Sequence, residues 1–330
     1  MNRRHFIQLS AGGIAASLTA CGKKEENRVN AQGKPIIRFG HFPNVTHVHG
    51  LVAHQLSRQG KGWFESRLDA EIEWNGSFNA GPAATESIIA DRLDVTYIGP
   101  SPTLNGYHTT KGKDIRILAG AANGGSALVV RKDSGIVKPE DFRGKKIGSP
   151  QLGNTQDVQI RAWLLDQGFK VTLKGDGDTF VVPTPNSNLI DLFTTKGLDA
   201  AWTAEPWVSR LEVETGAKVF LEDKDTNVTL LIARAKWLNN NKDLAKKLVA
   251  AHKDLTAWIL ANTAEAKKLV KAELNDLKMP AKDEILERAF PRVILTDVIS
   301  RESLDKMVKS AQKVGFYSDI PALDDLLPAL

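Results

Sequence analysis

The sequence predicts an α/β protein of two lobes, each a mainly parallel sheet flanked by helices. Its 330 residues are more than one ordinary hydrophobic core accommodates. Apolar, strand-like segments alternate along the chain with helix-like ones, an order typical of parallel sheets. Short segments rich in glycine or polar residues divide this alternation twice. The composition, 42% hydrophobic and 25% charged, argues against wholesale disorder.

The first series of elements lies in the N-terminal third of the chain. Thr46 can cap a helix that ends near residue 58. Proline directly follows Gly81 and Ser101, and proline is favoured at the first position of a helix, so further helices are expected to begin there. The strands expected between these helices cover residues 36–40, 70–74, 94–98 and 115–119.

A second series follows and ends in a long helical region. Its expected strands cover residues 127–131, 145–149, 180–182, 198–202 and 230–233. Its expected helices cover residues 156–167, 186–196, 242–260, 264–277, 282–290 and 301–314. No repeat of 20 to 50 residues is present, which excludes a solenoid.

Two crossover segments are expected to connect the lobes. One is the glycine-rich stretch 123–126, and the other is the polar stretch 223–227. If both are hinges, the first lobe comprises residues 35–124 and 227–330, and the second comprises residues 125–226.

The N-terminus resembles an export signal. Arg3 and Arg4 precede a run of apolar and small residues from 9 to 20. About twelve residues are too few to cross roughly 30 Å of hydrocarbon as a helix. A charged start followed by a short apolar stretch is typical of a secretory signal, and the paired arginines resemble the twin-arginine type. We therefore expect residues 1–20 to be a signal peptide and the protein to be exported.

Cys21 is the only cysteine, which excludes an intramolecular disulfide and a cysteine-based zinc site. Residues 18–22 resemble the lipobox of bacterial lipoproteins. The resemblance implies lipidation of Cys21, with residues 21–34 as a polar tether and membrane contact only through the lipid. We expect the protein in the periplasm or on the outer face of the cell membrane.

The small positive charge gives no indication of a nucleic-acid partner. The formal net charge of +5 comes from 44 basic and 39 acidic residues spread along the chain, not from a basic stripe. Removal of residues 1–20 takes away Arg3 and Arg4, which leaves 42 basic and 39 acidic residues and a charge of +3. Part of the basic excess therefore belongs to the export signal.

Small polar residues follow the carboxyl ends of several expected strands. Ligands of open parallel sheets bind beyond these ends. Three of the segments lead directly into helix N-termini, whose free N–H groups and positive dipole end suit an anion. The segments are residues 41–44, 77–81, 99–101 and 153–155.

Five motifs resemble the sulfonate, nitrate and taurine substrate-binding proteins of ABC importers. The resemblance covers residues 36 to 315. It implies a type II periplasmic-binding-protein fold that closes over a small anion, with an ABC permease and ATPase as partners. The motifs are GHFPNVTH at 40–47, FNAGP at 78–82, DVTYIGP at 94–100, PQLGNTQD at 150–157 and AEPW at 204–207.

The resemblance also implies a set of ligand-binding residues around the cleft. Asn154 and Thr155 lie where the anion loop of the second lobe is expected, and Gly81 lets the backbone of the first lobe approach a ligand closely. Each candidate also has a structural alternative, such as helix capping for Asn154, a turn for Asn123 or core packing for Trp207. The candidates are His41, Asn44, Asn79, Ala80, Gly81, Gly99, Ser101, Asn123, Asn154, Thr155, Glu205 and Trp207.

Glu205 and the histidines allow finer interpretations. The Glu205 carboxylate would repel a bare anion but would suit the amine of a zwitterion such as taurine. His47 and His49 point about 200° apart on a helix, and only His47 and His54 share a face. A metal pair on one helix face needs a spacing of three or four residues. We therefore expect no metal site and no cofactor.

We interpret the chain as a monomeric, lipid-anchored binding protein for an aliphatic sulfonate. It has no Gly-x-Ser-x-Gly elbow, no Walker loop and no cysteine to spare as a nucleophile, so we do not expect an enzyme. A binding protein for taurine, nitrate or a thiamine-pyrimidine precursor would belong to the same class. A pyrimidine-synthesis enzyme on the same fold and a ligand-sensing lipoprotein without a permease are rival interpretations from different classes.

Overall fold

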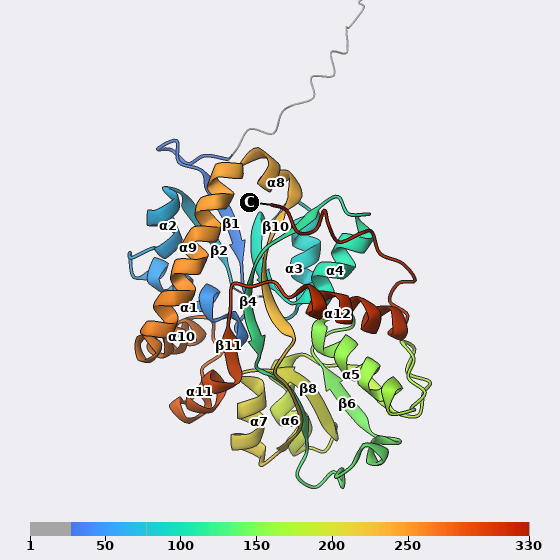
Figure 1. Ribbon diagram of the computed structural model, residues 1–330. Coiled ribbons are helices and arrows are strands. Elements are labelled where there is room, and N and C mark those ends of the chain that lie inside the picture. The colour runs from blue at the N-terminus through green and yellow to red at the C-terminus, as the bar shows by residue number, and fades with distance from the viewer. Residues whose placement is uncertain (1–27, 77, 330) are drawn as a thin grey trace, which may run out of the picture.

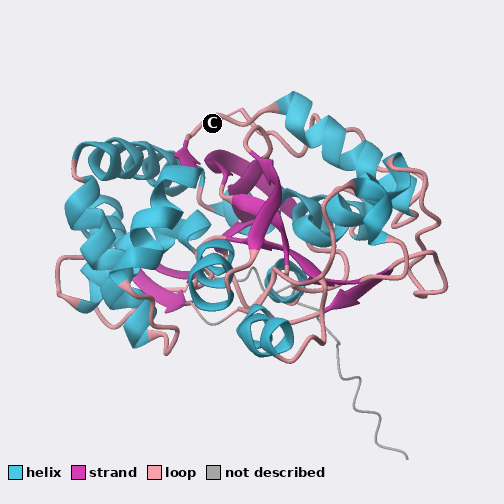
Figure 2. Cartoon of the chain, turned by 90° about the horizontal axis from the view of Figure 1, so that it is seen from below, coloured by secondary structure: helices cyan, strands magenta, loops and turns pink. Residues whose placement is uncertain are grey.

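The computed structural model describes residues 28–76 and 78–329, which form two lobes (Figure 1). Each lobe is built on one β-sheet with helices on both of its faces, as the view from below also shows (Figure 2). The expected signal peptide, residues 1–20, and the expected lipidation site, Cys21, lie outside the described residues. Within the described part, no helix is both long and apolar enough to cross a membrane.

The first lobe contains a six-stranded sheet in the order β11-β4-β10-β3-β1-β2. Strand β1 runs parallel to β2 and β3, whereas β10 runs antiparallel to β3 and β4, and β11 antiparallel to β4. The strands are β1 (Ile36–Gly40), β2 (Glu71–Asn75), β3 (Val95–Ile98), β4 (Ile115–Gly124), β10 (Asn227–Arg234) and β11 (Val293–Leu295).

The second lobe contains a five-stranded sheet in the order β7-β6-β8-β5-β9. Strand β6 runs parallel to β7 and β8, whereas β5 runs antiparallel to β8 and β9. The strands are β5 (Ser126–Val130), β6 (Lys146–Ser149), β7 (Phe180–Pro183), β8 (Ala200–Ala204) and β9 (Lys218–Asp223).

Most strands of each sheet run in one direction, as expected for the two-lobed α/β fold, and the exceptions are β10 and β11 in the first sheet and β5 in the second. The reason for the direction of β5 and β10 is the way the chain crosses between the lobes. Strand β4 ends at Gly124 and β5 begins at Ser126, so the chain enters the second sheet from the crossover side, and β10 enters the first sheet in the same way after β9 ends at Asp223. Strands β5 and β10 therefore run antiparallel to the strands of the βαβ units, whose carboxyl ends point toward the other lobe.

The first crossover depends on glycine. Gly124 and Gly125 have φ angles of +66° and +65°, a region that glycine adopts without steric strain. A Cβ atom on Gly124 would also lie 2.7 Å from the carbonyl oxygen of Arg292. The chain therefore passes between the sheets through a backbone shape that other residues would strain.

Helices cover the two faces of each sheet and enclose separate hydrophobic clusters. One face of the first sheet is covered by α1 (Val48–Arg58), α2 (Trp63–Leu68), α9 (Lys242–Ala261), α10 (Thr263–Asp276) and α11 (Asp283–Ala289). The other face is covered by α3 (Gly81–Ile89), α4 (Pro100–Thr109) and α12 (Arg301–Val314). The second lobe has α5 (Thr155–Asp166), α6 (Leu189–Thr194) and α7 (Trp207–Thr215).

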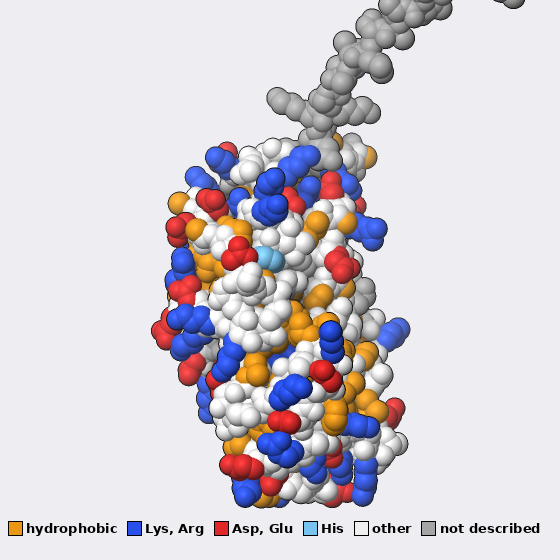
Figure 3. All heavy atoms as spheres, turned by 90° about the vertical axis from the view of Figure 1, so that its right-hand side faces the viewer, with side chains coloured by type: hydrophobic (Ala, Val, Ile, Leu, Met, Phe, Trp, Pro, Cys, Tyr) orange, Lys and Arg blue, Asp and Glu red, His pale blue; other side chains and the backbone are white. Residues whose placement is uncertain are grey.

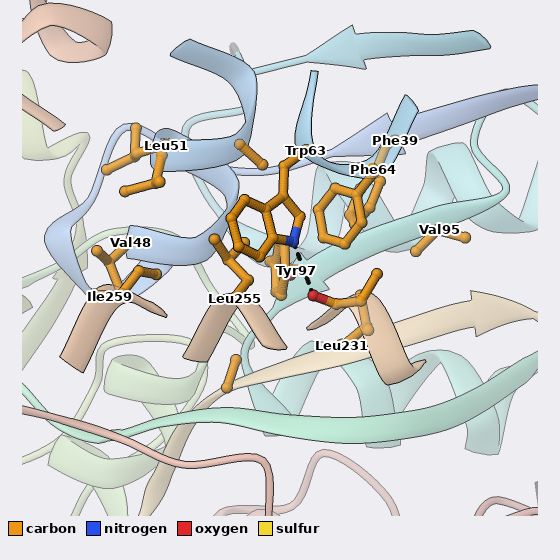
Figure 4. Packing of buried hydrophobic residues seen from close by; sticks show 14 of the residues in the cluster. Phe39, Val48, Leu51, Trp63, Phe64, Val95, Tyr97, Leu231, Leu255 and Ile259 are labelled. Atoms are coloured by element: carbon orange, nitrogen blue, oxygen red, sulfur yellow. Dashed lines mark hydrogen bonds between the residues drawn. The ribbon is translucent and has the colours of Figure 1, made fainter. Parts of the chain in front are cut away.

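Aromatic and aliphatic side chains pack together in the cluster between the first sheet and the helices α1, α2 and α9 (Figure 4). The Phe39 ring lies 5.3 Å from the rings of both Phe64 and Tyr97. Trp63 is buried and its indole Nε1 donates a hydrogen bond to the carbonyl oxygen of Ala251 at 2.9 Å. The indole thus packs in the core without leaving its N–H group unpaired.

Several short elements and one helix start differ from the sequence-based expectation. Residues Val45–His47 form a 3-10 turn, and His47, not Thr46, is the N-cap of α1. The elements that were not expected are α2, α7, β9, β11 and α8 (Ala235–Asn240). Most have six residues or fewer, a length at which packing against neighbouring elements outweighs local sequence preference.

Candidate ligand-binding cleft

Three helices begin at the cleft between the two lobes. The N-cap residues of α3, α4 and α5 are Ala80, Gly99 and Asn154, each with extended backbone. The side chain of Asn154 accepts a hydrogen bond from the Asp157 N–H group at 2.8 Å. Ala80 has no side chain that can cap a helix, so the first N–H groups of α3 remain available to a ligand. At the start of α4, Pro100 and Pro102 carry no N–H group, and that of Ser101 is bonded to Thr155 Oγ1, so α4 contributes the positive end of its dipole.

These helix starts line a cavity of about 40 Å³. Seven of the residues predicted from the sequence contribute to its wall: Asn44, Asn79, Ala80, Gly81, Gly99, Asn154 and Thr155. Five polar or aromatic residues that were not predicted also line it: Phe42, Thr46, His47, Gln156 and Asn186. Four of these residues, Phe42, Thr46, His47 and Gln156, lie within the motifs that carried the family resemblance. Treating every polar or aromatic residue of those motifs as a candidate would have identified them.

The lobes contact one another directly around this cavity. Ser101, on α4, donates from its hydroxyl to the carbonyl oxygen of Gly153 at 3.0 Å and from its backbone N–H to Thr155 Oγ1 at 3.4 Å. Asn79 Nδ2 donates to the carbonyl oxygen of Pro150 at 3.5 Å. The structure is therefore a closed form, which accounts for the small volume of the cavity.

Gly99 makes the close approach of the lobes possible. A Cβ atom at this position would lie 2.4 Å from Thr155 Oγ1 in the opposite lobe, a distance that requires a shift of the structure. The backbone of Gly99 has an ordinary φ of −73°, so the requirement for glycine is one of space and not of backbone conformation.

His47 presents an unpaired polar atom at the cavity. Its side chain is buried, and burial lowers its pKa to about 3, so the imidazole is neutral at physiological pH. Within the described part of the chain, its Nδ1 atom has no hydrogen-bond partner. Because buried polar atoms are nearly always paired, an unpaired ring nitrogen in a cavity wall indicates a ligand partner.

Hydrogen bonds orient the amides of the second lobe toward the same cavity. Asn154 Nδ2 donates to Gln156 Oε1 at 3.0 Å. Thr203 Oγ1 donates to Asn186 Oδ1 at 2.8 Å, which leaves the Asn186 amide nitrogen as a donor. Among the described residues of the cavity wall, none is Asp, Glu, Lys or Arg. The site therefore offers neutral donors and helix N-termini.

His41 lies away from the cavity, contrary to the expectation from the sequence. Its ring is buried on the other side of the first sheet, with Nε2 at 2.9 Å from His54 Nδ1. Burial lowers its pKa to about 3. Successive residues of an extended segment point to opposite sides, so Phe42 faces the cavity while His41 faces α1.

Two further candidates, Asn123 and Trp207, have structural contacts outside the cavity wall. The Asn123 side chain accepts a hydrogen bond from the Asn227 amide, which joins the crossover strands β4 and β10. Trp207 is packed in the second lobe and donates from Nε1 to Asn44 Oδ1 of the first lobe at 3.2 Å. Like Ser101, these two side chains connect strands or lobes and do not line the cavity.

Glu205 is buried in an ion-pair network that corrects its expected place in the cleft. Its carboxylate accepts hydrogen bonds from Ser209 N at 3.1 Å and Ser209 Oγ at 2.9 Å. Arg292, from the first lobe, pairs with it at 2.9 Å and also with Glu212 at 2.7 Å. Burial raises the pKa of Glu205, and the Arg292 guanidinium opposes this rise. The carboxylate thus acts between the lobes, not on a ligand.

Comparisons with known proteins agree on the family and the fold. The NMT1-like family model matches residues 30–274. The chain is 26% identical over 270 residues to a Bacillus subtilis (strain 168) protein named "Putative aliphatic sulfonates-binding protein", covering 79% of this chain and 76% of that relative.

Solved structures share the fold over most of the chain. The alkanesulfonate-binding protein SsuA from Xanthomonas axonopodis pv. citri, bound to MOPS, superposes with a TM-score of 0.70 at 18% identity, covering 90% of this chain and 96% of that one. The periplasmic nitrate-binding protein NrtA from Synechocystis PCC 6803 gives 0.67 at 14% identity, with coverages of 88% and 83%. The two-lobed fold is therefore that of periplasmic binding proteins.

Proposed function

The chain belongs to the NMT1-like family, and from this premise we propose that it is the substrate-binding protein of an ABC importer. It captures a small organic anion, an aliphatic sulfonate, between its lobes and delivers it to the permease. The observation that carries this proposal is the meeting of three helix N-termini at one cavity whose described wall residues carry no formal charge.

The cavity can hold an anionic head group with oriented neutral donors. The N–H groups at the start of α3 and the positive ends of the dipoles of α3 and α4 favour negative charge. Asn79, Thr155 and the neutral His47 add side-chain donors at the same wall. The oxygens of a sulfonate accept several such hydrogen bonds at once.

The remaining wall favours an alkyl group on the ligand. Phe42, Pro102, Pro150, Ala204 and Val228 supply apolar surface beside the donors. Nitrate has no apolar part to place there. Taurine carries an amine, and the carboxylate expected to pair with it, Glu205, is bound to Arg292 instead. A simple alkanesulfonate therefore fits better than nitrate or taurine, in agreement with the names of the sulfonate-binding relatives.

Ligand binding would stabilise the closed form. Each lobe supplies only part of the donor set, because α3 and α4 belong to the first lobe and α5 to the second. A ligand that contacts both sets shifts the equilibrium between open and closed forms toward closure. The permease would then recognise the closed, loaded protein.

We also propose that export and lipidation hold the protein at the outer face of the membrane. The support is the lipobox-like segment around Cys21 and the preceding export signal, both outside the described residues. Labelling with radioactive palmitate should mark the wild-type chain and not Cys21→Ser. A labelled Cys21→Ser chain would contradict this assignment without affecting the ligand proposal.

Calorimetric titration of the full chain tests the ligand class. Ethanesulfonate and butanesulfonate should bind, with taurine and nitrate binding more weakly, and each bound ligand should raise the melting temperature. Preferential binding of nitrate would overturn the sulfonate assignment but leave the transport role. Absence of heat and of a thermal shift with every anion would contradict the proposed ligand class.

A further inference from the structure

Three potential metal ligands meet in the first lobe, outside the ligand cavity. His41 follows β1, His54 lies on α1 and Glu273 lies on α10, and all three are buried. One ligand atom from each of the three residues lies within 4.8 Å of those from the other two. The cluster is used neither by the cleft nor by the contacts between the lobes.

One ring nitrogen of this cluster, His54 Nδ1, makes two short contacts but can carry only one hydrogen. His54 Nδ1 lies 2.9 Å from His41 Nε2 and 2.7 Å from Glu273 Oε1. If His54 Nδ1 is protonated, its single hydrogen can point well at only one of these two acceptors. If it is not, its lone pair faces the lone pairs of the carboxylate. Two ring nitrogens and a carboxylate oxygen thus lie close together, and hydrogen bonds cannot satisfy both contacts of His54 Nδ1.

We propose that His41, His54 and Glu273 form a binding site for a divalent metal ion of the zinc class. Two imidazole nitrogens and one carboxylate oxygen are a ligand set that zinc accepts, with water completing the tetrahedron. Imidazole ligands also favour zinc and its late first-row neighbours over magnesium or calcium. Ligands about 2 Å from a tetrahedral metal lie roughly 3.3 Å apart. The two contacts of His54 Nδ1, at 2.9 and 2.7 Å, therefore need to lengthen by only about half an ångström.

The surroundings of the cluster suit a metal site. Arg58 Nε donates to the second carboxylate oxygen of Glu273 at 2.8 Å, and His41 Nδ1 lies 3.4 Å from the carbonyl oxygen of Phe42. Such outer contacts orient metal-binding carboxylates and histidines. The Trp74 ring stacks on His54 with centroids 5.1 Å apart, which fixes the plane of that imidazole.

An ion pair between His54 and Glu273 would explain only one of the two short contacts. It leaves the approach of His41 Nε2 to the same nitrogen without a hydrogen between them. A bound metal accounts for both contacts. It would also tie the loop after β1, which carries the cavity residues Phe42 and Asn44, to α1 and α10.

Zinc titration of the purified full chain, after removal of metals with EDTA, tests this site. Calorimetry should give one zinc ion per chain, and cobalt should give the visible absorption bands of a low-coordinate site. His54→Gln and Glu273→Gln should each weaken zinc binding by at least about tenfold. His108→Gln, a partly exposed histidine on α4, is the matched control and should bind zinc like the wild type.

The proposal fails if the folded wild-type chain binds no stoichiometric zinc, if both variants bind zinc normally, or if His108→Gln loses binding equally. Circular dichroism checks that each variant folds. X-ray absorption of the zinc-loaded wild type gives a result that needs no variant: two imidazoles in the zinc shell support the site, and a shell of oxygen atoms alone overturns it. None of these outcomes depends on whether sulfonates bind.

Discussion

Thr155 shows how one side chain can serve both the closed form and the ligand. It is the first residue of α5, and its hydroxyl lies in the cavity wall beside Gly99. It accepts a hydrogen bond from Ser101 N at 3.4 Å through an oxygen lone pair, so its O–H hydrogen remains able to donate to an anion.

Thr155→Ala should therefore weaken sulfonate binding by about 1–2 kcal/mol, roughly fivefold to thirtyfold. Calorimetric titration of the variant measures this change. Thr194→Ala is a matched control, because Thr194 is an exposed threonine of α6 whose hydroxyl donates only to its own helix. Equal affinity of Thr155→Ala and Thr194→Ala would remove the Thr155 hydroxyl from the site.

The histidines of the loop after β1 mark the limit of prediction from sequence at this scale. His41 and His47 both follow a strand that ends at the cleft, and the motif pattern favours His41. Which of them faces the cavity depends on the alternation along the extended segment and on the 3-10 turn at Val45–His47. The unpaired Nδ1 of His47 results from burial between elements that are distant in sequence, so local patterns do not reveal it.

The elements that form the cleft are those that local sequence rules predict best. Proline at the helix starts indicated α3 and α4, and Asn154-Thr155 indicated α5, because capping chemistry acts within a few residues. By contrast, β11 has three residues and exists through its pairing with β4. The mixed direction of the sheets likewise depends on the crossovers, which no single segment encodes.

Arg292 connects elements of the two lobes through its guanidinium. It lies in the turn between α11 and β11 and pairs with Glu205 and Glu212, which precede and belong to α7. Arg292→Ala should lower the free energy of unfolding by on the order of 3 kcal/mol, because it leaves the buried Glu205 carboxylate without its cation. Urea denaturation measures this loss.

A second expected effect of Arg292→Ala is a more open molecule, visible as a larger radius of gyration in small-angle X-ray scattering. Arg288→Ala is the control, because Arg288 forms an exposed ion pair with Glu284 at 3.6 Å, and such pairs contribute little. If Arg292→Ala is as stable and as compact as Arg288→Ala, the network does not hold the lobes together.

At the scale of the whole molecule, the closed form is held by contacts on both sides of the cleft. Lys313 of α12 pairs with Asp166 of α5, and Arg292 pairs with glutamates of the second lobe near α11 (Figure 1). On the face shown in Figure 3, basic and acidic side chains are interspersed over both lobes. On this face neither lobe presents a surface of a single charge sign, and the ion pairs named above are specific contacts between the lobes.

Buried neutral histidines should make the whole fold sensitive to acid. Burial lowers the pKa of His41 and His47 to about 3 and of His252 to about 4, and that of His49 well below its usual range. In the unfolded chain these groups take up protons near pH 6.5, whereas in the folded chain they do not. Since the unfolded state then binds more protons, the free energy of unfolding falls as the pH drops from about 7 toward 4.

The decrease should amount to several kcal/mol between pH 7 and pH 5, with an upper bound of about 8 kcal/mol, because each of the four buried histidines contributes up to about 1.4 kcal/mol per pH unit below pH 6.5. Glu205 acts in the opposite sense, since its raised pKa favours the folded state at low pH, but it is one group against four histidines.

Urea unfolding followed by tryptophan fluorescence, without ligand and with EDTA, measures the change in the free energy of unfolding with pH. The His252 ring is buried and hydrogen-bonded to Tyr97 and to the carbonyl oxygen of Gly120. His252→Gln should make the slope shallower, because it removes one of the four groups that take up a proton only on unfolding. A stability that stays constant from pH 7 to pH 5 would show that these histidines become protonated without unfolding the chain.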